Sequence, residues 1–153
     1  MIFPTKVGGF ARMTILRYDS KSLDVSAGYV LEEKDSAIHA MVSVYPATAS
    51  VTAAERGDFN QRKSELLASH PGAHWQSDRE YSLVQEGKKH PGRLATLEFE
   101  RGEKGATEKF FSRLYFFVED GKWVIQYRVT YPKSFRVGKK IQEFLQTLEW
   151  PSH

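Results

Sequence analysis

Two segments have the residue spacing of familiar ligand sites, and neither keeps the rest of the required pattern. His70 and His74 stand four residues apart, which on a helix places two imidazoles on one face for zinc. Pro71 and Gly72 interrupt that spacing, so we expect no helix there and predict no metal site. The segment 87–94 has the glycine spacing of a phosphate-binding loop but lacks the terminal lysine and hydroxyl residue. We interpret it as a basic hairpin loop.

Carboxylates and nucleophiles form no recognisable catalytic set. The pairs Glu32/Glu33 and Glu98/Glu100 fall in turns or edge segments, where adjacent acids are usually solvated. No Gly-x-Ser-x-Gly motif is present, and the chain has no cysteine. The sequence therefore predicts no catalytic residue and no cofactor. An enzyme of unrecognised type, with a site assembled across the sheet, stays as the alternative.

The strongest local signal is a turn near the end of the chain. The dipeptide at 120–121, Asp-Gly, lies between two runs of aromatic and β-branched residues and suits a two-residue hairpin turn. Such a turn pairs Val118 with Trp123 and Leu114 with Tyr127. We expect this apolar face to lie beneath the helices.

The opposite face of that hairpin mixes aromatic and basic side chains, so we expect it to be covered by other strands, a partner or a ligand. It pairs Arg113 with Arg128 and Tyr115 with Gln126. The candidate contacts for a ligand or a partner are Arg113, Tyr115, Gln126, Arg128 and Tyr131.

Two guanidinium groups directly across from each other repel unless an anion lies between them. Glu98 or Glu100, on the preceding strand, would supply that anion in a purely structural interpretation. The functional interpretation is an acidic ligand, or a carboxylate of a protein partner, held by Arg113 and Arg128.

Nucleic acid fits the sequence less well. Residues 109–116 have the aromatic and basic character of an RNA-recognition strand, but they lack the glycine of that motif. The strand order also differs from the fold that carries it. We therefore do not predict a nucleic-acid partner.

Hydrophobic periodicity predicts seven strands and two helices. The strands are expected at 10–18, 24–33, 37–45, 79–87, 93–101, 107–118 and 122–130, and the helices at 52–69 and, after Pro132, over an apolar stripe from Val137 to Leu148. Short turns imply a mostly antiparallel sheet, with both amphipathic helices packed on one face. The predicted class is α+β, order βββα–ββββα, in a single domain over 1–153.

Composition and charge restrict the classes of protein to which the chain can belong. Aromatic residues make up 13% of the chain, which is enough to build a core and is incompatible with disorder. No apolar stretch approaches the roughly 20 residues that span a bilayer, so no transmembrane segment is predicted. The net charge of +3 is diffuse. If Met1 is the natural start we expect a cytoplasmic protein, and if an export signal preceded it, a periplasmic or envelope protein.

The sequence resembles small uncharacterised bacterial proteins of the envelope type, and its element order resembles the PsbP/Mog-like α+β fold. The residues that carry the resemblance are 3–4, 8–10, Arg12, Tyr18, 26–29, 42–46, Trp123, 127–132 and 150–151. They are turn and packing positions, so no catalytic residue is carried over. The resemblance implies a non-enzymatic accessory or partner-binding domain, often exported in bacteria.

The leading hypothesis is therefore a non-catalytic binding domain that recognises a protein or a small acidic ligand through the aromatic and basic sheet face. The alternatives are the enzyme named above and a structural subunit that buries this face in a homodimer.

Overall fold

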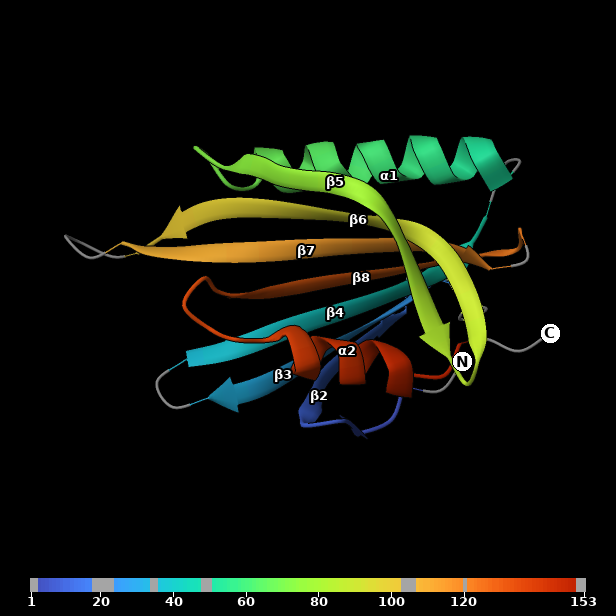
Figure 1. Ribbon diagram of the computed structural model, residues 1–153, viewed down its shortest axis with the longest axis horizontal. Coiled ribbons are helices and arrows are strands. Elements are labelled where there is room, and N and C mark those ends of the chain that lie inside the picture. The colour runs from blue at the N-terminus through green and yellow to red at the C-terminus, as the bar shows by residue number, and fades with distance from the viewer. Residues whose placement is uncertain are drawn as a thin grey trace.

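An antiparallel sheet of eight strands runs through the described part of the chain, in the order β1-β2-β3-β4-β8-β7-β6-β5. The computed structural model describes residues 3–17, 24–33, 36–47, 51–102, 107–119 and 121–150, without the side chains of 51–58. Figure 1 shows the sheet with α2 in front of it and α1 along its upper border. The mostly antiparallel α+β class predicted from the sequence is confirmed.

The elements follow the predicted order with one addition. The strands are β1 (Lys6–Val7), β2 (Phe10–Arg17), β3 (Val25–Glu33), β4 (Ser36–Pro46), β5 (His74–Gln85), β6 (Lys88–Arg101), β7 (Glu108–Glu119) and β8 (Trp123–Pro132), and the helices are α1 (Val51–Ala68) and α2 (Gly138–Thr147). The count of seven strands was wrong because β1, with only two residues, is too short to show a hydrophobic period.

The segment 87–94 is also not the loop that we predicted. The turn lies at Glu86 and Gly87, whose φ angles are 49° and 79°, and β6 begins at Lys88. Pro91 is accommodated because the pairing of β6 with β7 begins only at the next residue, so its missing N–H removes no ladder hydrogen bond on that side.

The two helices pack on opposite faces of the sheet, so the prediction that they share one face is wrong. Phe116 and Phe117 are neighbours on β7 and are both 0% exposed. Phe116 packs against Phe59 of α1, at 5.6 Å between ring centroids, whereas Phe117 belongs to the cluster around α2. Successive side chains of a strand point to opposite faces, so β7 requires a cover on both.

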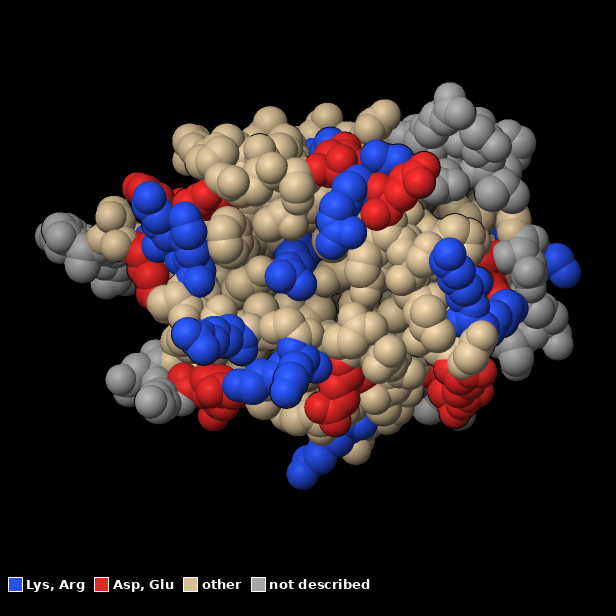
Figure 2. All heavy atoms as spheres, in the orientation of Figure 1, with Lys and Arg blue, Asp and Glu red and all other residues tan. Residues whose placement is uncertain are grey.

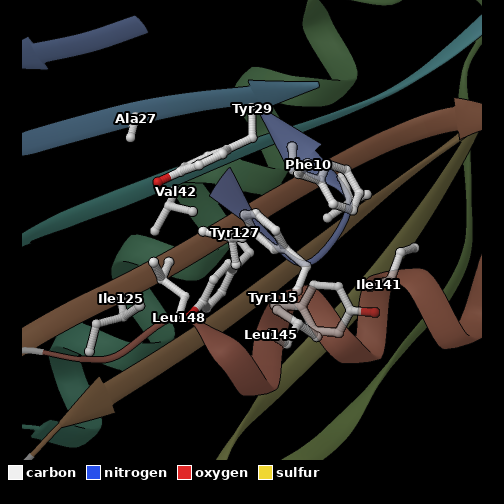
Figure 3. Close-up of a cluster of buried hydrophobic side chains, with 14 of the residues drawn as sticks. Phe10, Ala27, Tyr29, Val42, Tyr115, Ile125, Tyr127, Ile141, Leu145 and Leu148 are labelled. Carbon is white, nitrogen blue, oxygen red and sulfur yellow. The ribbon is translucent and has the colours of Figure 1, made fainter. Parts of the chain in front are cut away.

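The core on the α2 side is the larger of the two. Figure 3 shows the rings of Tyr115 and Tyr127 beside Ile141 and Leu145 of α2. The β5–β6 hairpin bends forward over this side (Figure 1), and Gln85 Nε2 donates hydrogen bonds to the Leu145 and Leu148 carbonyls, at 2.7 and 2.9 Å. These bonds satisfy carbonyl groups that have no hydrogen-bond donor within the helix, because they lie at its C-terminal end.

The last hairpin has a register one residue away from the predicted one. Glu119, not Val118, pairs with Trp123, and Lys122 N–H donates to the Glu119 carbonyl at 2.9 Å. Gly121 has a φ of 66°, which also suits a three-residue connection. A slip of one residue exchanges the faces of one strand relative to the other.

We predict that Gly92→Ala destabilises the sheet by about 1–3 kcal/mol through overpacking. A Cβ at Gly92 would lie 2.4 Å from the Phe116 carbonyl oxygen and from a ring carbon of Phe117. Urea unfolding followed by circular dichroism measures the loss. Gly138→Ala is the matched control, since nothing lies within 4 Å of its Cβ position. Equal stability of the two variants would contradict this packing.

Candidate functional site

A groove of about 490 Å³ lies between α1 and the sheet. Phe59 and Leu66 of α1 pack over β6, β7 and the nearer part of β8, and Tyr45 of β4 packs at the border of the Phe59 cluster. The floor of the groove is made by β3, β4 and β8, and its wall by the last turns of α1.

Strand register places polar side chains in a row across this floor. Ser26 pairs with Ser43, and Ser43 pairs with Gln126, so all three point to the α1 side of the sheet. The two serine hydroxyls are hydrogen-bonded at 2.9 Å. The Oε1 atom of Gln126 is buried and accepts no hydrogen bond from the described residues. Buried polar atoms of this kind are uncommon and call for an explanation.

Arg128 lies one row further along the same floor, opposite Met41. Its guanidinium makes no ion pair or hydrogen bond within the described part of the chain. The residue is exposed, and partial loss of hydration beside the groove lowers its pKa. Arg128 also affects His70, at the end of α1. Burial lowers the pKa of His70, and the positive charge of Arg128 lowers it further.

The wall of the groove is electrically balanced. Arg62 and Glu65 form an ion pair at 3.1 Å, and the guanidinium of Arg62 lies 5.6 Å from the centre of the Tyr45 ring. At the Tyr45 end of the groove stands Asp24, whose carboxylate makes no contact of this kind with the described residues. The groove thus has an acid at one end and a base at the other.

The structure separates the five candidate residues. Gln126 and Arg128 lie on the α1 side, in the groove, while Arg113, Tyr115 and Tyr131 lie on the α2 side. The predicted pairing of Arg113 with Arg128 is wrong. Arg113 pairs with Val129, and Arg128 with Leu114, because of the one-residue change in register.

Arg113 is held by aromatic side chains. Its Nη1 donates to the Tyr115 hydroxyl at 3.2 Å, and its guanidinium lies 5.6 Å from the centre of the Tyr131 ring. Burial raises the pKa of Tyr115, and the nearby charge of Arg113 only partly offsets this. Both tyrosines are buried and belong to the core against α2, where Figure 3 shows Tyr115, and Arg113 lies against them.

The glutamates that we considered as counter-ions do not serve an arginine pair. Glu98 accepts a hydrogen bond from Lys133 at 3.0 Å and another from Gln76. Glu100 is exposed and stands opposite Lys109. Since the two arginines lie on different faces, the repulsion that required an anion between them does not arise.

Sequence reasoning missed a buried polar cluster at the C-terminal end of α2. His90 and Glu119 are 7% and 8% exposed, and Nδ1 of His90 lies 3.0 Å from a Glu119 carboxylate oxygen. The Trp150 ring lies 4.2 Å from that of His90, and its Nε1 donates to the Tyr127 hydroxyl at 2.6 Å. This cluster ties the C-terminal segment to the β5–β6 hairpin. Its partners lie 23 or more residues apart, so no local pattern predicts it.

The remaining surface gives no stronger candidate. Figure 2 shows basic and acidic side chains interspersed on the α2 side of the molecule. Within the described ranges, no three His, Asp or Glu side chains are placed to hold a metal ion, and no helix is long and apolar enough to cross a membrane.

No family model matches the chain, and the comparison with curated proteins found no match.

We predict that removing Arg113 destabilises the protein and that removing Arg128 does not. Arg113→Ala removes a charged hydrogen bond to Tyr115 and should cost about 1–3 kcal/mol. Arg128→Ala removes a side chain without such a contact to the described residues, so the change should stay within about 0.5 kcal/mol. Urea unfolding of both variants tests this. Similar losses for both would place the two side chains in equivalent surroundings and contradict the register.

Proposed function

We propose that this chain is a non-catalytic binding domain that takes a small acidic ligand in the groove between α1 and the sheet. Arg128 contacts the anionic group, and Gln126 contributes a hydrogen bond. The observation that carries the proposal is the Arg128 guanidinium, which lies in a groove without a carboxylate partner among the described residues.

A partly desolvated cation is unfavourable unless an anion meets it. Arg128 is exposed, so its lowered pKa reflects only a partial loss of hydration beside the groove. An anionic ligand would offset the loss of hydration, and its attraction to Arg128 would be stronger in a partly closed groove than on open surface. Arg113, by contrast, already has Tyr115 and Tyr131 around it.

The shape and lining of the groove support a small ligand over a large flat partner. Its volume of about 490 Å³ falls within the range of small-molecule sites, roughly 300–1,000 Å³. The Ser26 and Ser43 hydroxyls and the Gln126 amide offer fixed hydrogen-bonding groups beside the cation. Such groups orient a ligand once its charge is held.

We also propose that the domain is PsbP/Mog-like and serves an accessory role. The support is the antiparallel sheet with two helices in the order βββα–ββββα, after the short β1. A fold of this kind carries many functions, so the ligand proposal rests on the groove alone.

We predict that Arg128→Gln weakens the binding of a simple dicarboxylate by about tenfold or more, since a charged hydrogen bond is lost. Succinate is titrated into the ¹⁵N-labelled protein, and the shift of the Gln126 side-chain amide signals gives the Kd. Lys139→Gln, which removes an exposed cation on α2, is the matched control and should leave the Kd unchanged. Shifts that leave Gln126 untouched, or equal Kd values for all three proteins, would contradict the proposal.

A further inference from the structure

We infer that the ligand of the groove is a short linear peptide with both ends free, its carboxylate on Arg128 and its amino group on Asp24. The inference rests on the proposed function and adds the chemical class and direction of the ligand. It comes from the charges at the two ends of the groove and from the polar row between them.

The end charges are opposite in sign and each is without a partner within the described ranges. Arg128 and Asp24 both line the groove, and no ion pair or hydrogen bond joins either side chain to a described residue. The only other charges on the described lining are Arg62 and Glu65, which neutralise each other at 3.1 Å. The groove therefore matches a ligand with one positive and one negative end.

Strand register sets the separation of these charges. Asp24 directly precedes Val25, which pairs with Val44, and Val44 pairs with Ile125 of β8. Arg128 thus lies four residues along and two strands across from Asp24, which places their Cα atoms about 16 Å apart. Strand side chains stand roughly perpendicular to the sheet, so we take the separation of the two charged groups to be comparable. An α-amino acid, whose amino and carboxylate groups are bonded to the same carbon, is too short to reach both.

An extended tripeptide has the required length. Three residues span about 10 Å, and an ion-pair contact of about 3 Å at each end makes up the rest. The row of Ser26, Ser43 and Gln126 lies midway between the two ends, where the peptide groups of such a ligand would fall. Hydroxyl and amide side chains both donate to carbonyls and accept from N–H groups.

Calorimetric titration of the whole protein with four matched probes tests the inference. The probes are trialanine, N-acetyl-trialanine, trialanine amide, and 8-aminooctanoate, which has the same number of bonds between its charges but no peptide groups. We expect trialanine to bind best. Capping either end should weaken binding by about tenfold or more, and 8-aminooctanoate should also bind more weakly.

Two substitutions assign the ends. In Asp24→Asn, N-acetylation should no longer matter, and in Arg128→Gln, amidation should no longer matter. Glu80→Gln and Lys139→Gln, both at exposed positions outside the groove, should behave as the unchanged protein.

The outcomes separate the two proposals. If succinate binds in an Arg128-dependent way while N-acetylation or Asp24→Asn has no effect on trialanine, the peptide inference is overturned and the proposed function stands. Equal affinity for trialanine and 8-aminooctanoate would overturn the role given to the peptide groups. If no probe binds in an Arg128-dependent way, both proposals fail.

Discussion

Strand β7 carries large apolar side chains on both faces, and the rest of the structure follows from the need to cover them. Phe116 and Phe117, adjacent on β7, are both fully buried, one toward each helix. Each face of the sheet therefore needs its own layer. On the α2 side the helix, the bent β5–β6 hairpin and the first strands together form that layer (Figure 1). On the other side α1 stands alone, and a single helix is narrower than a sheet of eight strands.

The groove is the consequence of that mismatch in width. Ala27, Val42 and Tyr127 point toward α2 and are 0% exposed. Their neighbours Ser43 and Gln126 point to the face that α1 only partly covers, and there the side chains are polar. A solvated sheet face would explain serine at such a position. It does not explain a buried amide oxygen without a donor among the described residues.

Most of the elements could be read from the sequence, because alternating and helical hydrophobic patterns are local. The strand from 37 to 45 and the helix from 52 to 69 were placed within a residue or so of β4 and α1. The errors that bear on the candidate site were long-range or depended on one turn. Gly121 suits both two-residue and three-residue connections, and its positive φ alone does not choose between them. The contact of His90 with Glu119 spans 29 residues and has no sequence signature.

That single ambiguity decides what the two arginines can do. In the predicted register they would share a face and need a common anion. In the observed register Arg113 lies among tyrosines, where its charge is met by a hydroxyl and an aromatic ring. Arg128 lies in the groove, where no described residue forms an ion pair or a hydrogen bond with its guanidinium. The two residues have the same chemistry and nearly the same distance from the turn. Their different surroundings assign a packing role to one and leave the charge of the other available to a ligand.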